Sequence, residues 1–327
     1  MILTELVAKY GSLSIIGMCK NAGKTTVLNA LVTGWRGNGG ALALTSIGRD
    51  GESQDVVTGT HKPRIYVQEG ALIATAAELL MHCDVTQEVL GATGISTPLG
   101  EVVIVRARSD GYVQLGGPSM AQQLIWLNGE LARLGAELVI IDGAISRKSL
   151  CAPAVTEATI LCTGASYSPS IEKVVQDTAR AAQLLTLPKS EYWRHVPQAR
   201  ITLGARAGEE LPCPDMTLHE AVRAHPECDR VFMRGAVTDS MLLPVLTSAA
   251  PLEGYEFCAE DASKLLLSPQ VVEKLELRRC ALSVFRRTEL LAVAVNPVSA
   301  YGTDFDRSEL RRRMCAAVDV PVIDVME

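Results

Sequence analysis

Two stretches of the chain are apolar at every position, residues 138–141 (Leu-Val-Ile-Ile) and residues 290–295 (Leu-Leu-Ala-Val-Ala-Val). Continuous apolar runs of this kind are typical of strands that are buried on both faces of a parallel sheet. Shorter runs of strand character recur along the chain, at residues 13–17, 41–45, 61–67, 102–105, 111–115, 159–163, 230–233, 254–258, 281–285 and 320–325. The pattern predicts strands from one end of the chain to the other.

Helical stretches alternate with these strands, and we expect them at residues 25–35, 70–81, 118–134 and 168–185. This alternation predicts a fold of the α/β class, with a mostly parallel central sheet flanked by helices. The segments 102–105 and 111–115 are separated by a loop containing Arg-Ser-Asp-Gly, which favours a β-hairpin or a sheet edge there.

The loop after the first strand reads Gly-Met-Cys-Lys-Asn-Ala-Gly-Lys-Thr-Thr from Gly17 to Thr26 and opens the first helix. A loop of this layout presents converging backbone N–H groups and the positive end of a helix dipole to phosphate. Gly23 allows close approach, Lys24 supplies a charge for the β- and γ-phosphates, and Thr25 supplies a hydroxyl for Mg²⁺. The sequence thus predicts a binding site for ATP or GTP with Mg²⁺, bordered by Gly17, Lys20, Asn21, Ala22, Gly23, Lys24, Thr25 and Thr26.

The spacing of the loop departs from the usual phosphate-binding pattern, Gly-x₄-Gly-Lys-[Ser/Thr]. Met18 stands where that pattern has its first glycine, and Gly17 comes one residue earlier. The alternative interpretation is a Gly-Lys-Thr that follows a strand by chance. The flanking strand and helix favour the phosphate-binding loop.

Two aspartates follow predicted strands. Asp142 comes directly after an apolar run, where a carboxylate can hold Mg²⁺, usually through a water. Asp50 follows the strand at 41–45, and ligands of parallel sheets bind beyond the carboxyl ends of strands; Glu52 and Asp55 are alternatives. Both aspartates also fit a surface turn, because Asp-Gly is a favoured turn pair. We assign Lys24, Asp50 and Asp142 as candidate catalytic residues and Thr25, Asp50 and Asp142 as candidate metal ligands.

Two further positions allow two interpretations each. Cys19 is either a reactive thiol, since a helix N-terminus lowers a thiol pKa, or an ordinary loop residue, which we favour. Asn296 precedes Pro297 after an apolar strand, where an amide could read a nucleotide base. An ordinary Asx-Pro turn is the interpretation that we favour for Asn296.

Composition and charge limit the kinds of binding partner and the cellular compartment that we expect. A net charge of −6 and an aromatic content of 4% argue against a nucleic-acid partner. No apolar run approaches the roughly 18 residues that span a bilayer, and no signal pattern opens the chain, so we expect no membrane association. The nine cysteines lack C-x-x-C spacing and the five histidines lack ligand spacing, so we expect reduced thiols in a cytoplasmic protein and no zinc site.

Residues 187–193 (Leu-Pro-Lys-Ser-Glu-Tyr-Trp) break the alternation of strands and helices. We therefore expect a nucleotide-binding domain at 1–195 and a further α/β region of unknown role at 196–327.

The loop from Lys20 to Thr26, Asp50, and the run Val-Ile-Ile-Asp-Gly that ends at Gly143 together resemble the SIMIBI class of P-loop NTPases. That class includes dethiobiotin synthetases, molybdopterin-guanine-dinucleotide accessory GTPases, MinD-type ATPases and the GTPase chaperones of cobalamin enzymes. The resemblance covers roughly residues 10–165. It implies that Lys24 contacts phosphates, that Thr25 binds Mg²⁺, and that Asp50 and Asp142 organise metal and water. It does not extend to a trans-acting lysine, because Lys20 is one residue too close to Lys24 and Asn21-Ala22 replaces Gly-Gly.

In the sequence of this loop and in its length, the chain also resembles the reactivase subunits of adenosylcobalamin-dependent lysine aminomutase. This resemblance implies a partner ATPase subunit and an aminomutase client from which damaged cobalamin is expelled.

Three functions follow from these observations. The first is a Mg²⁺-dependent nucleoside triphosphatase that remodels a client protein. A protein partner or client enzyme is the expected partner, and a homo-oligomer is an open alternative. ATP is favoured over GTP because no Asn-Lys-x-Asp motif is visible. The second is an ATP-dependent ligase or kinase acting on a small carboxylate, which Arg49, His61, Lys62 and Arg147 would clamp. The third is a nucleotide-binding scaffold that does not hydrolyse.

Overall fold

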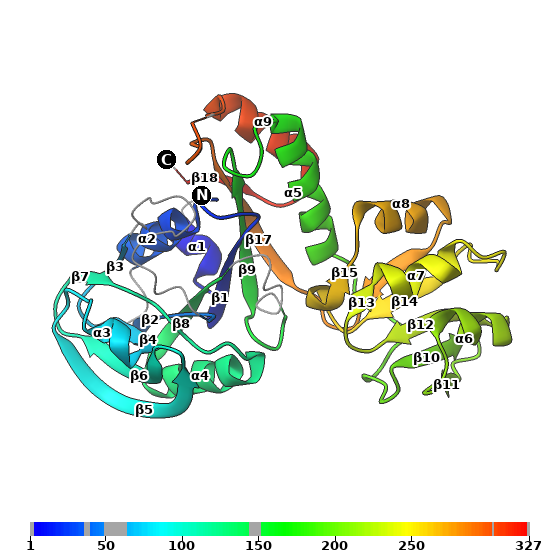
Figure 1. The fold of residues 1–327 in the computed structure, drawn as a ribbon, viewed down its shortest axis with the longest axis horizontal. Helices are drawn as coiled ribbons and strands as arrows, with labels where there is room; N and C mark the ends of the chain where they lie inside the picture. The colour runs from blue at the N-terminus through cyan, green and yellow to red at the C-terminus, as the bar shows by residue number, and fades with distance from the viewer. Residues whose placement is uncertain (1–2, 36–39, 49–63, 144–151, 303, 326–327) are drawn as a thin grey trace. The chain divides into compact units, whose positions relative to one another are not determined.

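The computed structural model describes residues 3–35, 40–48, 64–143, 152–302 and 304–325 (Figure 1). Its contacts divide the chain into two compact units. The first unit consists of the residues up to Ala182 together with those from Glu289 onward, and the second is Gln183–Thr288. The last part of the chain therefore belongs to the same unit as the predicted loop.

A nine-stranded sheet forms the centre of the first unit. Its order is β18-β17-β9-β1-β8-β2-β4-β6-β5, and the seven strands from β18 to β4 are parallel, whereas β6 runs antiparallel to both of its neighbours. The strands are β1 (Ser12–Gly17), β2 (Ala41–Ser46), β4 (Leu72–Ala76), β5 (Gln87–Thr97), β6 (Gly100–Ala107), β8 (Ala136–Asp142), β9 (Ala158–Gly164), β17 (Glu289–Asn296) and β18 (Val322–Asp324). The expected α/β class with a largely parallel sheet is confirmed.

Helices accompany this sheet, and β3 (Ile65–Val67) pairs separately with β7 (Gly111–Val113). One face carries a core to which α2 contributes Leu28 and Leu31 and the central strands contribute Leu13 and Ile140. The alternate residues of β8 point the other way, as the twofold period of a strand requires, and α4 packs against that strand. The helices of this unit are α1 (Leu3–Val7), α2 (Lys24–Gly34), α3 (Ala77–Leu80), α4 (Ala121–Arg133), α5 (Ile171–Leu185), which crosses into the second unit, and α9 (Arg307–Ala317).

The second unit has a five-stranded sheet of order β11-β10-β12-β14-β16 and an apolar core of its own around Val231 and Phe257. Its strands β12, β14 and β16 are parallel, and β10 and β11 are antiparallel. Its elements are β10 (Ile201–Ala205), β11 (Glu210–Pro212), α6 (Leu218–Ala224), β12 (Cys228–Met233), β13 (Val237–Thr238), α7 (Asp239–Leu246), β14 (Glu256–Ala259), η2 (Ala262–Lys264), β15 (Leu265–Leu266), α8 (Pro269–Leu277) and β16 (Ala281–Val284).

The division of the chain differs from the expected boundary near residue 195. The run at 290–295 is β17, which pairs in parallel with β9 so that Asn296 lies opposite Gly164. Because this pairing is part of the first sheet, residues 289–327 return to the first unit, and the second unit is an insertion between α5 and β17.

Two local predictions are corrected. The helix expected over 70–81 is strand β4 followed by the single turn α3, because the five residues of β4 are all buried and pair with β2 and β6. Sheet pairing outweighs the helix propensity of its alanines. The expected hairpin between 102–105 and 111–115 is absent, since β6 pairs with β4 and β5 while β7 pairs with β3.

Candidate functional site

The loop from Gly17 to Thr26 and Asp142 meet at the carboxyl edge of the first sheet. In the parallel register Asp142 lies opposite Ile15 of β1 on one side and Ser46 of β2 on the other. Backbone hydrogen bonds join the end of β8 to both neighbours: Gly143 N donates to Ile15 O at 3.0 Å, and Ile47 N donates to Asp142 O at 3.1 Å. Three neighbouring strands therefore bring their polar ends together beside the loop.

The loop reaches its helix through two residues in the left-handed region. Asn21 has φ 59° and Gly23 has φ 95°. Helix α2 begins at Lys24 with no side-chain cap, and its first backbone bond runs from Val27 N to Gly23 O at 3.0 Å. The first N–H groups of an α-helix have no partner inside the helix. A helix end of this kind is the type of backbone site at which anions bind in other proteins.

Lys24 folds back over the start of the loop. A Cβ built on Gly17 would lie 3.1 Å from both Cγ and Cδ of Lys24 and 3.3 Å from Cβ of Ala22. The aliphatic stem of Lys24 thus occupies the space that a larger residue at Gly17 would need. Gly17, although it stands one place early in the motif, allows the close packing of this lysine stem.

Asp142 is 9% exposed at the end of β8. Cys162 of β9, opposite Gly17, lies within electrostatic reach of both Lys24 and Asp142. Burial raises the pKa of the Cys162 thiol to about 12, the charge of Lys24 opposes this shift, and the carboxylate of Asp142 adds to it. The charges of Lys24 and Asp142 therefore both act on the Cys162 thiol.

The thiol of Cys19 does not show the lowered pKa that a reactive cysteine needs. Burial raises its pKa, and Lys24 only partly offsets this effect. This direction agrees with the interpretation of Cys19 as an ordinary loop residue.

The oxygen atoms at this edge suit a hard cation. Thr25 is half-buried in the first turn of α2, and Asp142 ends the neighbouring strand. Ser46 is fully buried opposite Asp142, and its Oγ has no hydrogen-bond partner among the described residues. Hydroxyl and carboxylate oxygens are the ligands that Mg²⁺ takes together with waters and phosphates. Within the described ranges, no group of three or more His, Cys, Asp or Glu side chains forms a metal site by itself.

Residues of the returning C-terminal segment close one side of the loop. Asn296 Nδ2 donates to Asn21 O at 3.3 Å, and Asn296 Oδ1 accepts from Val298 N at 3.1 Å. A Cβ built on Gly23 would lie 3.2 Å from Cβ of Asn296 and 3.2 Å from Cγ2 of Val325. The amide oxygen of Asn296 thus forms an Asx turn, and its amide nitrogen bonds to the loop. The interpretation of Asn296 as a turn residue is confirmed.

Sequence reasoning missed Ser46, Gly164 and Val325 as neighbours of this edge. For Val325 no signal was present, since nothing in the sequence links residue 325 to residue 23. The apolar runs predict both the strand that ends at Asn296 and the strand at 159–163, but not that the two pair.

Of the remaining predicted site residues, the structure gives the exposure of three and does not describe the others. Lys20 is exposed, Ala22 is buried, and Thr26 is half-buried in the first turn of α2. Asp50 lies outside the described residues, as do Glu52 and Asp55. The predicted substrate clamp, Arg49, His61, Lys62 and Arg147, also lies outside them.

A cavity of about 260 Å³ opens at the same edge, two strands away from β1. Its walls are the end of β2 at Ile47 and Gly48, the turn 96–99 between β5 and β6, and the segment from Gly116 to Ser119. Gly117 packs directly on β2, because a Cβ there would lie 2.0 Å from Ser46 O. The cavity therefore lies beside the polar strand ends described above.

Comparison of the chain with family models, with curated proteins and with solved structures returned no match. In the part of the chain that the structure describes, no helix is both long enough and apolar enough to cross a membrane. The eight described cysteines are all free thiols.

Proposed function

We propose that this chain is a Mg²⁺-dependent nucleoside triphosphatase of the P-loop type, with ATP as the favoured nucleotide. The observation that carries the proposal is the junction of β1 and α2, where Gly23 with φ 95° introduces an uncapped helix and the Lys24 stem packs over Gly17. Backbone N–H groups of this junction would hold the phosphates, and Lys24 would neutralise the charge that develops during phosphoryl transfer.

Mg²⁺ would be held by Thr25, with Asp142 acting through a water, and would supply further neutralisation of the phosphate charge. The burial of Asp142 supports this role, because a buried carboxylate stays ionised most readily when a cation compensates it. Asp50 remains the candidate from sequence for the metal and the attacking water.

The biological role that we propose is remodelling or reactivation of a metabolic enzyme, in a cytoplasmic setting with a protein partner. Two points support it: the resemblance of the loop sequence to aminomutase reactivase subunits, and an inserted unit, Gln183–Thr288, with a core of its own. The inserted unit would offer a surface for the client that the nucleotide-binding unit alone does not provide.

A second candidate is a ligase or kinase that transfers the γ-phosphate to a small carboxylate. The cavity of about 260 Å³ beside Ile47 and Gly48 favours it, because it lies at the same strand edge as the loop and could hold an acceptor. A scaffold that binds nucleotide without hydrolysis is the third candidate.

The binding site is tested by titration calorimetry with ATP and Mg²⁺. Lys24→Ala should weaken binding by about a hundredfold, since charge-assisted contacts to phosphate are lost. Lys173→Ala is the matched control, because Lys173 pairs on the surface of α5 with Asp177. Equal affinity of wild type and Lys24→Ala would refute the assignment.

The rate of ATP hydrolysis under different conditions distinguishes the three candidate functions. Slow basal hydrolysis that a protein partner accelerates supports the remodelling factor. Rapid ATP consumption only in the presence of a small metabolite supports the ligase, and nucleotide binding with no hydrolysis under either condition supports the scaffold.

A further inference from the structure

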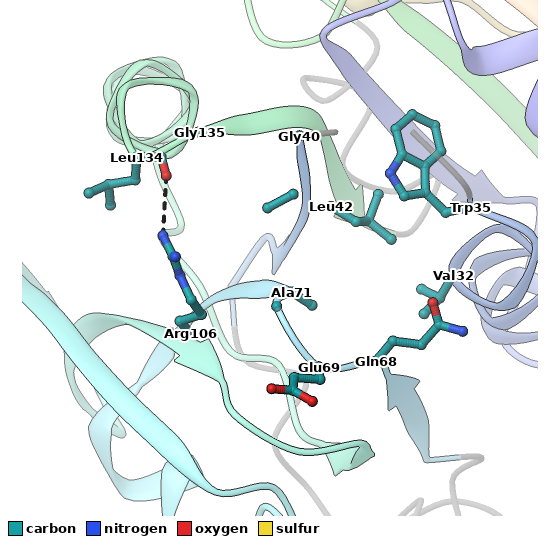
Figure 2. Close-up of a pocket in the computed structure, with 12 residues that line it drawn as sticks. Val32, Trp35, Gly40, Leu42, Gln68, Glu69, Ala71, Arg106, Leu134 and Gly135 are labelled. Atoms are coloured by element: carbon teal, nitrogen blue, oxygen red, sulfur yellow. Dashed lines mark hydrogen bonds between the residues drawn. The ribbon is translucent and has the colours of Figure 1, made fainter. Parts of the chain in front are cut away.

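A second and larger cavity lies at the amino-terminal edge of the first sheet, away from the loop. Its volume is about 460 Å³, and its walls include the residues that precede or begin β2, β4 and β8 (Figure 2). Strand β2 has six residues, so at about 3.3 Å per residue its two ends are roughly 17 Å apart. A ligand in this cavity would be too far from the loop to receive a phosphoryl group.

Arg106 is the cationic side chain among the residues that line this cavity. Its Nη2 donates to Leu134 O at the long distance of 3.5 Å, and its Nε is buried with no hydrogen-bond partner among the described residues. No carboxylate of the described residues lies within salt-bridge distance of it. A guanidinium has five donors in a fork that matches a carboxylate, and leaving buried donors unused is costly.

Arg108, two residues further along the chain, shows the contrast. It forms an ion pair with Glu88 at 2.6 Å, and about half of its side chain is exposed. The lack of a partner is thus a property of Arg106 and not of this stretch of chain.

The wall around Arg106 is polar in part and apolar in part, with the apolar side chains across from the guanidinium. Figure 2 shows Arg106 extending along one side of the cavity toward Leu134, while Leu42 and the indole of Trp35 lie across from it. Val32 and Leu42 are almost fully buried, at 1% and 6% exposure. Small-molecule sites commonly combine such apolar walls with a few polar groups that fix orientation, in volumes of about 300–1,000 Å³.

Nearby acids limit the charge of the ligand. Glu69 lines the cavity but is not ion-paired with Arg106, and Glu137 accepts a hydrogen bond from Gly40 N at 3.2 Å at the same edge. Glu88 of β5 also lies opposite Arg106 of β6 in the antiparallel register. Acids at this edge disfavour a dianion such as a phosphate monoester more than they disfavour a monoanion. A single carboxylate matches Arg106 without adding repulsion of that size.

We propose that this cavity binds a small organic monocarboxylate, whose carboxylate pairs with Arg106 and whose apolar body packs against Trp35 and Leu42. The site is separate from the proposed nucleotide site and goes beyond the proposed function. Its ligand is an effector or a bound metabolite and does not take part in phosphoryl transfer.

Ligand-observed NMR saturation transfer on the full chain tests the proposal without nucleotide. The probes are hexanoate and indole-3-acetate, their neutral amides hexanamide and indole-3-acetamide, and phenyl phosphate, all at millimolar concentration. We expect both carboxylates to bind and the amides to bind at least about tenfold more weakly, since the amides lose the charge-assisted pair with the guanidinium.

Variants then locate the site. Arg106→Gln should weaken carboxylate binding by about tenfold or more, Arg106→Lys should retain part of it as a point charge, and Arg108→Gln should leave it unchanged. Circular dichroism melting curves check that the variants fold, and the retained binding by Arg106→Lys tests the site even where Arg106→Gln is unstable.

Four results would overturn the proposal: no saturation transfer to either carboxylate, amides that bind as well as the acids, phenyl phosphate that binds more tightly than both, or equal binding by a folded Arg106→Gln protein. None of these results affects the calorimetric test of Lys24, so the proposal for this cavity and the proposed nucleotide site are tested independently.

Discussion

Asn296 at the end of the returning strand β17 occupies the space beside Gly23 that a side chain on this glycine would need. A Cβ on Gly23 would lie 3.2 Å from Cβ of Asn296, and the amide of Asn296 donates to the carbonyl of Asn21 in the same loop. The conformation of the loop is therefore fixed by its own sequence and by a residue far away in the chain.

Gly23→Ala should destabilise the first unit and weaken nucleotide binding. With φ 95° an alanine is strained, at about 1–3 kcal/mol, and its methyl group would also press on Asn296 and Val325. Urea denaturation gives the loss of stability, and calorimetry gives the loss of affinity.

Gly129→Ala is the matched control. Gly129 lies inside α4, where a Cβ would meet nothing within 4 Å, so alanine should stabilise the helix by roughly 0.5–1 kcal/mol. A Gly23→Ala protein as stable as wild type, with full affinity, would contradict the strain and the contact described here.

Asp142→Asn should abolish the dependence on Mg²⁺ and lower hydrolysis by orders of magnitude, because neutralisation of charge carries most of phosphoryl transfer. Nucleotide binding through the backbone and Lys24 should persist. A Mg²⁺ titration of ATPase activity makes the comparison. If Asp142 serves only the turn before Gly143, asparagine replaces it well, and a wild-type titration curve would show this.

Alkylation of the native protein should distinguish its thiols. Since burial raises the pKa of Cys162 to about 12, almost none of this thiol is ionised at pH 8. Iodoacetamide should therefore modify the exposed Cys315 first and Cys162 only after unfolding. Bound nucleotide should further slow modification of Cys19. Mass spectrometry of the modified peptides measures each rate, and rapid labelling of native Cys162 would disprove the burial.

Stability at low pH should depend on Asp229 in the second unit. Hydrogen bonds from Arg230, at 2.8 and 3.2 Å, hold the pKa of this carboxyl below its usual value, and Arg206 adds a third bond while burial opposes the shift. A lowered folded-state pKa means that the stabilisation is present above about pH 4 and is lost as the pH falls through the folded-state pKa.

Asp229→Asn should therefore cost about 1 kcal/mol at pH 7, and the difference from wild type should shrink toward pH 3. Urea denaturation across this pH range measures it. Glu253→Gln, which breaks the largely exposed pair with Arg279 at 2.7 Å, should change stability by less than about 0.5 kcal/mol. A difference between wild type and Asp229→Asn that does not change with pH would contradict the assignment.

The sequence predicted the parts of the first unit that local pattern determines. Apolar runs gave β1, β8, β9 and β17, and the loop motif located the start of α2. The segment 70–81 was misread because its alanines favour a helix, and only pairing with β2 and β6 makes residues 72–76 a strand. The contacts of Asn296 and Val325 with the loop depend on which strand β17 joins, and no local pattern encodes that choice.

The inserted position of the second unit has a consequence for how the protein is made. At roughly 5–20 residues per second, a ribosome needs about 5–20 s to translate Gln183–Thr288. Throughout that interval β9 has been synthesised, but β17, the strand that covers its outer edge, does not yet exist. The inserted unit, translated without interruption and provided with its own core, can be completed first. The nascent chain thus carries an open apolar sheet edge for several seconds, and its loop is fully supported only when Asn296 and Val325 have been added.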